Sequence, residues 1–219
     1  MSKKVAVLLS GCGVYDGAEI YETVLTLLRL DEQGVKYQCI APDIAQKEVV
    51  NHQTGEVDAD AKRSVLQEAA RLARGDILAL DQAQEEDFDA LILPGGFGVA
   101  KNFSDFATQG AQASVEPQVK AFTQAFVRAK KPIGLMCIAP ALSAELIGPG
   151  VVCTIGRDAG VSGALTEMGA LHKSADADEI VVDQQHLLVT TPAYMMATRL
   201  SEAKVGIFKL VDKVIELIK

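Results

Sequence analysis

Residues 4–20 read KVAVLLSGCGVYDGAEI, and this stretch decides the fold class. Its first part, residues 5–9, is a continuous apolar run, which is typical of a strand buried on both faces of a parallel sheet. Residues 19–33 then carry apolar side chains at helical spacing and close at a glycine. Residues 35–41 are expected to form the second strand, which ends at Pro42. The beginning of the chain therefore predicts a β-α-β unit.

Strands and helices continue to alternate along the rest of the chain. A polar turn between two apolar runs, 180–183 and 187–190, predicts an antiparallel hairpin near the C-terminus. No long linker or sequence repeat divides the chain. We therefore expect one α/β domain over residues 1–219, doubly wound around a mostly parallel sheet. The other expected strands cover residues 77–80, 89–93, 133–136 and 151–155, and the other expected helices cover 61–73, 118–130, 139–146 and 193–218.

The composition excludes some classes of protein and argues against some kinds of partner. The chain has 219 residues, of which 49% are hydrophobic, and its formal net charge is -8. The apolar share excludes a disordered chain, and the acidic balance argues against nucleic acid or an anionic membrane surface as a partner. The apolar run at 5–9 is too short for a signal-peptide core or a membrane span, so we expect a cytoplasmic protein with reduced thiols.

A cysteine stands at the end of one expected strand. Residues 133–140 read IGLMCIAP, so Cys137 lies where an apolar strand must turn sharply into a helix. This resembles the geometry of a nucleophile elbow, and the amino end of the helix would favour the thiolate. A buried cysteine that acts as a small apolar residue is the alternative interpretation.

Two glycine-rich turns follow other expected strands. Residues 92–98 read ILPGGFG, whose glycines would let backbone N–H groups form half an oxyanion hole, or simply make a flexible turn. In residues 10–19, SGCGVYDGAE, the spacing G-x-G-x-x-x-G makes dinucleotide binding a minority interpretation. Glu19, at the start of the first helix, would meet the elbow cysteine if this loop folds over the sheet edge. Its alternative role is to complement the helix dipole.

The remaining cysteines and the histidines predict neither a metal nor a cofactor. None of the four cysteines forms a C-x-x-C pair, and the three histidines have no ligand spacing among them. For each histidine we favour a surface position over a functional role. We therefore expect no metal and no bound cofactor.

The motifs taken together resemble the ThiJ/PfpI superfamily, which shares the flavodoxin-like fold of class I glutamine amidotransferase domains. Within it, the chain resembles the ElbB-type group, whose older description is enhancing lycopene biosynthesis protein. No residue of this sequence explains the link to isoprenoid biosynthesis that the older description implies. The matching segments run over nearly the entire chain: SGCGVYDGAEI, NHQTGE, LILPGGFGVAKNFSDFA, GLMCIAPA, EMGA and VTTPAYM.

The resemblance implies a catalytic site and an activity. Cys137 matches the nucleophile, Glu19 the acid that hydrogen-bonds its sulfur, and Gly96 and Ile138 the residues whose backbone amides form the oxyanion hole. ElbB-type proteins are described as cofactor-independent glyoxalases that convert glyoxal to glycolate through a cysteine hemithioacetal. A protein deglycase activity has been proposed for the superfamily. The resemblance also implies a homodimer.

The chain departs from the wider superfamily in its histidines. The residue after Cys137 is Ile138 where amidotransferases have histidine, and no histidine lies near residues 155–156. Both absences weaken the hypothesis that a Cys-His pair hydrolyses amides. They leave Glu19 as the residue that would transfer most of the protons. Two alternatives stay open: a redox or stress sensor whose Cys137 oxidises, and, with less support, a glutamine amidase domain that needs a partner synthase.

Overall fold

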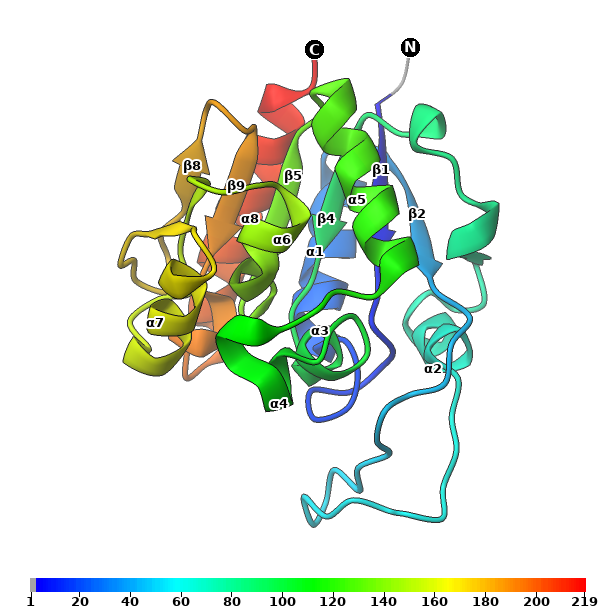
Figure 1. The fold of residues 1–219 in the computed structure, drawn as a ribbon. Helices are drawn as coiled ribbons and strands as arrows, with labels where there is room; N and C mark the ends of the chain where they lie inside the picture. Colours follow the sequence, from blue (N-terminus) through cyan, green and yellow to red (C-terminus); the bar gives the residue numbers. More distant parts are fainter. Residues whose placement is uncertain (1–2) are drawn as a thin grey trace.

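A central β-sheet organises the structure, a computed structural model that describes residues 3–219. Its strands are β1 (Lys4–Leu8), β2 (Lys36–Ala41), β3 (Ile77–Ala79), β4 (Ala90–Leu93), β5 (Ile133–Met136), β8 (Val181–Asp183) and β9 (Leu188–Thr191). The strand order is β3-β2-β1-β4-β5-β9-β8, and every neighbouring pair is parallel except β8 with β9 (Figure 1). The order reverses between β1 and β4, which is where ligands of doubly wound folds bind.

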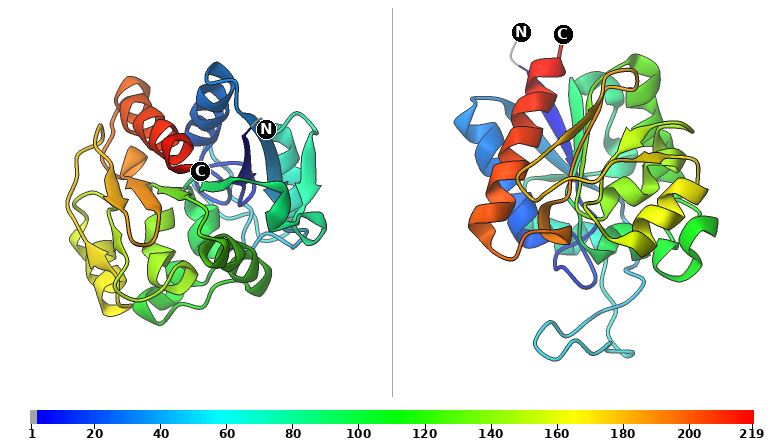
Figure 2. Two further views of the ribbon diagram at one scale, coloured as in Figure 1. Left: turned by 90° about the horizontal axis from the view of Figure 1, so that it is seen from above. Right: turned by 90° about the vertical axis from the view of Figure 1, so that its left-hand side faces the viewer.

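Helices cover both faces of the sheet. Figure 2 shows α1 and α8 side by side on one face, while α5 lies on the other. The helix α1 begins where Glu19 accepts a hydrogen bond from the Glu22 amide, and α5 begins with Pro117, a residue suited to a first helical position. The helices are α1 (Ile20–Glu32), α2 (Val65–Leu72), α3 (Phe97–Lys101), α4 (Phe106–Gln109), α5 (Pro117–Ala129), α6 (Ser143–Leu146), α7 (Ala159–Glu167) and α8 (Leu200–Leu217).

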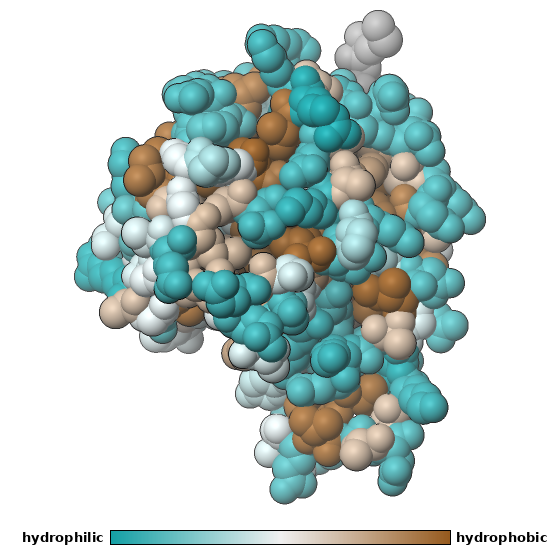
Figure 3. Space-filling model, viewed as in Figure 1, coloured by the Kyte–Doolittle hydropathy of each residue, from teal (hydrophilic) through white to brown (hydrophobic). Residues whose placement is uncertain are grey.

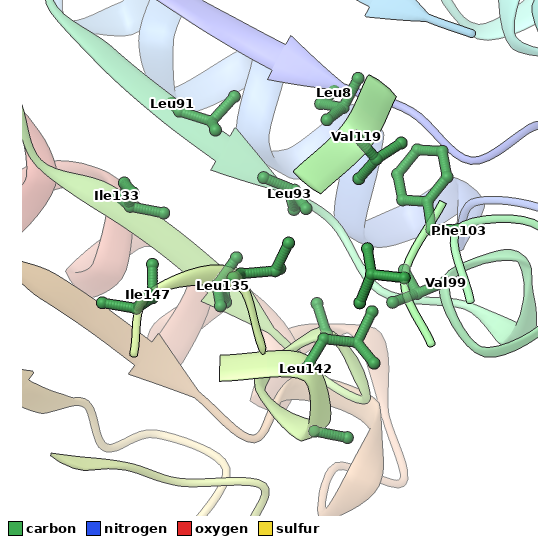
Figure 4. Close-up of a cluster of buried hydrophobic side chains, with 14 of the residues drawn as sticks. Leu8, Leu91, Leu93, Val99, Phe103, Val119, Ile133, Leu135, Leu142 and Ile147 are labelled. Atoms are coloured by element: carbon green, nitrogen blue, oxygen red, sulfur yellow. The ribbon is translucent and has the colours of Figure 1, made fainter. Parts of the chain in front are cut away.

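The sheet separates two hydrophobic clusters. Because side chains alternate between the faces of a strand, Leu91 and Leu93 of β4 point to the α5 side while Ile92 points to the α1 and α8 side. Figure 4 shows the first cluster, in which Leu93 and Leu135 from the sheet lie with Val119 of α5 and Phe103. Burial on both faces explains the continuous apolar runs in the sequence.

The expected fold class is confirmed, including the antiparallel hairpin of β8 and β9. Three expected elements differ. The strand expected at 151–155 is the short β6 (Val152–Cys153), which pairs with β7 (Leu171–His172) in a separate two-stranded parallel sheet. The helix expected at 139–146 is a 3₁₀ turn (Ala139–Leu142) followed by the short α6. The last helix begins only at Leu200, and α7 was not expected.

The segment between β2 and α2 projects from the sheet edge (Figure 1). Two isolated bridges, Val50 with Val57 and Ala45 with Ser64, hold its two arms together. The buried Asp16 carboxylate accepts the Val50 amide at 2.7 Å, which ties the segment to the loop after β1. Figure 3 shows a hydrophobic patch on this projection within an otherwise mixed surface. Among the helices of residues 3–219, none has the length and apolar character to cross a membrane.

Candidate active site

Cys137 directly follows the last residue of β5 and has a backbone angle φ of 59°. This left-handed conformation is unusual for a residue other than glycine. The Cys137 amide donates to the Thr191 carbonyl at 3.0 Å, so the parallel pairing of β5 with β9 continues to this bend. Cys137 is only 8% exposed. The structure therefore contains the strained elbow that the sequence predicts.

Two backbone amides reach the sulfur. The backbone N–H groups of Gly96 and Ile138 lie close enough to Cys137 Sγ to lower the pKa of its thiol. Gly96 has φ of 96°, and a Cβ at this position would lie 2.3 Å from the Gly17 carbonyl oxygen, so only glycine fits there. The expected amide pair is thus placed around the cysteine.

The loop after β4 is fixed by the loop after β1. The Gly95 carbonyl accepts the Glu19 amide at 3.0 Å, and the Gly98 amide donates to Gly17 at 2.9 Å. The carboxyl ends of β1, β4 and β5 lie at the same edge of the sheet (Figure 1). The topology therefore brings three loops that are distant in sequence to one place.

The carboxyl group at the sulfur belongs to Glu22. Its Oε2 accepts the Gly95 amide at 2.8 Å, and its Oε1 accepts the Tyr194 amide at 3.3 Å. The Oε2 oxygen lies beside the thiol of Cys137, since a Cβ built at Gly95 would be 2.9 Å from Glu22 Oε2 and 3.0 Å from Cys137 Sγ. Glu22 has no exposed surface. Amides from the loops after β4 and β9 thus hold a buried carboxyl group against a buried thiol.

The expectation that Glu19 hydrogen-bonds the cysteine is wrong in this structure. Glu19 is the N-cap of α1, and its Oε2 accepts the Glu22 amide at 2.7 Å. An acid at the cap is used by its own helix, whereas Glu22, at the third helical position, points toward β4 and β5. The sequence AEIYE contains both acids at a spacing of three, so the cap rule could have separated their roles.

The ionisation of the thiol and that of the carboxyl group are coupled. Burial, followed by the charge of Glu22, raises the pKa of the Cys137 thiol well above its ordinary value, although the two amides oppose the rise. Burial also raises the pKa of Glu22 to about 7. Two adjacent buried acids do not both ionise readily, so at least one of them stays protonated at neutral pH. The expected thiolate is not favoured by a helix dipole, because α6 has only four residues.

The histidines lie elsewhere. His52 accepts the Tyr15 amide at 3.2 Å, His186 hydrogen-bonds Asp183 at 2.8 Å, and His172 lies beside Gly156. Within residues 3–219 no histidine is a hydrogen-bond partner of the Cys137 thiol. The same residues contain no group of three or more His, Cys, Asp or Glu side chains arranged to hold a metal ion. The homodimer and the cofactor-free site stay predictions.

Curated relatives match almost the whole chain. The chain is 44% identical to the "ES1 protein homolog, mitochondrial" of Rattus norvegicus, covering 98% of this chain and 84% of that protein. It is 43% identical to the human "Glutamine amidotransferase-like class 1 domain-containing protein 3, mitochondrial", covering 98% and 83%. The expectation of a cytoplasmic location is contradicted by these relatives, which are named as mitochondrial proteins.

Solved structures agree with the fold described above. An "isoprenoid biosynthesis protein with amidotransferase-like domain" from Ehrlichia chaffeensis superposes with a TM-score of 0.93, at 37% identity over 100% of both chains. Drosophila melanogaster DJ-1beta superposes with a TM-score of 0.62 at 19% identity over 99% of this chain and 96% of that one, a likeness of fold alone. The model of the DJ-1/PfpI family matches residues 3–201. The chain therefore belongs to the DJ-1/PfpI family.

Proposed function

We propose that the protein is a cofactor-independent glyoxalase that converts glyoxal to glycolate at Cys137. The observation that carries the proposal is the buried Glu22 carboxyl group beside the thiol of a strained elbow cysteine, with the amides of Gly96 and Ile138 near the same sulfur. A nucleophile, a proton carrier and two hydrogen-bond donors are what addition to an aldehyde requires. Similarity to the Ehrlichia chaffeensis protein supports membership of the ElbB-type group.

The first step is addition of sulfur to one aldehyde carbon. The proton of the pair resides on Glu22 as Cys137 attacks, and the carbonyl oxygen becomes an alkoxide. The amides of Gly96 and Ile138 stabilise the developing negative charge. Glu22 then protonates the alkoxide, which gives a hemithioacetal and leaves Glu22 as a carboxylate.

The second step moves hydrogen between the two carbons. The Glu22 carboxylate removes the proton from the hemithioacetal carbon, and an enediol forms. Glu22 returns a proton to the neighbouring carbon, so one carbon is oxidised to a thioester and the other is reduced to an alcohol. Water then cleaves the thioester to glycolate and restores the thiol. A carboxyl group with a pKa of about 7 suits both proton transfers at neutral pH.

The exposure of the sulfur favours a small substrate. Cys137 is 8% exposed, so glyoxal can approach it more easily than a carbonyl adduct on another protein. The same burial does not favour the redox sensor, which needs an accessible thiol of lowered pKa. The glutamine amidase needs a histidine at the thiol, and the described histidines have other neighbours.

Turnover of glyoxal by three variants tests the proposal. After metal removal we expect Cys137→Ser to lose all measurable turnover and Glu22→Gln to lose at least about 100-fold. Cys12→Ser is the matched control, because Cys12 is the free cysteine with the greatest exposure, and it should retain wild-type activity. Full activity in either of the first two variants, with correct folding, would refute the assignment.

A further inference from the structure

A second buried carboxyl group accompanies the site without touching the sulfur. Glu19 is 7% exposed and lies one helical turn before Glu22. Its Oε2 accepts the Glu22 amide at 2.7 Å, while its own amide donates to the Gly95 carbonyl at 3.0 Å. Glu19 therefore contacts the backbone of both residues that form the carboxyl-to-amide contact Glu22–Gly95.

We propose that Glu19 is a positioning residue, whose carboxylate fixes the backbone of Glu22 and keeps a negative charge beside the Glu22–Cys137 pair. This inference rests on the proposed function in treating those two side chains as the reacting pair. A neutral cap such as serine would suffice to begin the helix. The chain instead places a charged cap where it is largely buried next to another acid, which costs stability and thus requires a reason.

In the described part of the chain, residues 3–219, no Lys, Arg or His side chain is among the groups that shift the pKa of Glu19 or Glu22. The titratable groups that act most strongly on Glu22 are Glu19 and Cys137. Tyr194, whose amide holds Glu22, is itself influenced by Glu19, Tyr21 and Glu22. These groups come from α1, the end of β5 and the turn after β9, and all of them are acids. The field of Glu19 thus acts on the pair unopposed by a neighbouring positive charge.

A negative charge beside an acid pair makes each proton harder to remove. While Glu19 is ionised, the Glu22–Cys137 pair keeps both protons to a higher pH than it otherwise would. Removal of that charge should lower the pH at which the pair loses its first proton and at which the thiolate becomes available. We expect a downward shift of about one pH unit, because the two carboxyl groups occupy one turn of a helix.

The experiment measures the rate of alkylation of Cys137 by iodoacetamide from pH 6 to 11, followed by peptide mass, in a Cys12→Ser background. Peptide mass counts Cys137 separately from Cys39 and Cys153, whose pKa values burial raises to about 12 and about 11. Glu19→Gln keeps the cap acceptor and removes the charge, so its alkylation midpoint should fall by about one unit. Glu19→Asp keeps both the cap acceptor and the negative charge, so its alkylation midpoint should equal that of wild type.

A matched control separates this effect from capping. Glu116 is the N-cap of α5 and accepts the Val119 amide at 2.8 Å, far along the chain from the site. Glu116→Gln should leave the midpoint unchanged. If Glu19→Gln does not fold, Glu19→Ser serves as a second neutral cap with the same expected shift. An unchanged midpoint in both neutral variants, or an equal shift in Glu116→Gln, overturns the proposal. Alkylation does not depend on glyoxal turnover, so a failed glyoxalase assay leaves this result interpretable.

Discussion

Two buried cysteines at different strands of the sheet show what distinguishes a reactive site from a core position. Cys39 lies inside β2 and is 2% exposed, while Cys137 lies just after β5 and is 8% exposed. Burial raises the pKa of both thiols, that of Cys39 to about 12. Neither exposure nor the direction of the pKa shift separates them.

Their polar surroundings do separate them. Within residues 3–219 the sulfur of Cys39 has no hydrogen-bond partner; Cys39 belongs to the apolar core, and Asp76 is the charged group that acts on its thiol. The sulfur of Cys137 meets two amides and a carboxyl group, and its backbone has a φ of 59°. Backbone strain and buried polar groups cost stability, and strained residues cluster at functional sites. The comparison teaches that donors and backbone conformation, rather than burial, identify the functional thiol.

We expect the largest effect from Gly95→Ala, which tests whether the polar neighbours of Cys137 make it the functional thiol. A Cβ at Gly95 would lie 2.4 Å from Cys137 Cβ and 2.9 Å from Glu22 Oε2. Both neighbours are fixed by backbone contacts, so the added methyl must separate the thiol from the carboxyl group. We expect glyoxal turnover to fall at least about 100-fold and the free energy of unfolding to fall by about 1–3 kcal/mol. Steady-state kinetics and urea unfolding measure the two effects.

Gly163→Ala is the control for that variant. Gly163 lies inside α7, and an added Cβ there would meet no atom within 4 Å. Because alanine is the better helix former, we expect stability to rise by about 0.5–1 kcal/mol with unchanged turnover. Wild-type turnover in Gly95→Ala would show that the contact between Glu22 and Cys137 is not needed.

The second expected effect is a pH dependence of stability that comes from Glu22, the carboxyl group beside Cys137. Glu22 has its pKa raised from the usual 4.5 to about 7, so the folded state binds a proton more tightly than the unfolded state. The stability that this preference contributes is full below pH 4.5 and is lost as the pH rises to 7. We expect wild type to lose about 1–3 kcal/mol of unfolding free energy over that range.

Glu22→Gln should remove this loss, so its stability curve should be flatter between pH 4.5 and 7. Carboxyl groups whose pKa is lowered by folding have the opposite pH dependence, and they titrate at lower pH. The pKa of Glu202 is lowered to about 2 by the Thr198 amide and then by Arg199. Urea unfolding at closely spaced pH values measures both curves. Identical slopes in wild type and Glu22→Gln would mean that Glu22 is not the group that titrates.

The sequence predicts the sheet well because each strand is buried on both faces. The runs at β1, β4 and β5 are apolar throughout, and few other structures bury such runs. The short β6 and β7 could not be predicted in the same way. Each has two residues, and their pairing in a separate sheet depends on contacts made after the main sheet has formed.

The site is predictable only in part for a related reason. The elbow at Cys137 and the loop with Gly96 follow from local composition, since an apolar strand must end at glycine or at a sharp turn. The identity of the acid follows only when the helix start is placed correctly, because Glu19 as the N-cap bonds its own helix and Glu22 is then left to face the sheet. The amide of Tyr194 comes from a distant turn, and no local pattern indicates that it holds Glu22.

The smallest expected effect returns to the two cysteines. Cys39→Ser places a hydroxyl among apolar side chains without a partner, which should cost about 1–3 kcal/mol of unfolding free energy. Cys137→Ser places the same hydroxyl against the Glu22 carboxyl group and the Gly96 and Ile138 amides, and should cost less than about 1 kcal/mol. Urea unfolding at pH 7 compares the two substitutions directly.

The order of the two costs is the informative quantity, because both substitutions replace sulfur by oxygen at a buried position. A hydroxyl that inherits hydrogen-bond partners loses little, whereas one that has none keeps its full desolvation cost. An equal or greater cost at Cys137 would mean that its polar neighbours cannot accommodate a hydroxyl. In that event the sulfur of Cys137 contributes to stability as an apolar group, as Cys39 does, and the contrast drawn from its polar neighbours would fail.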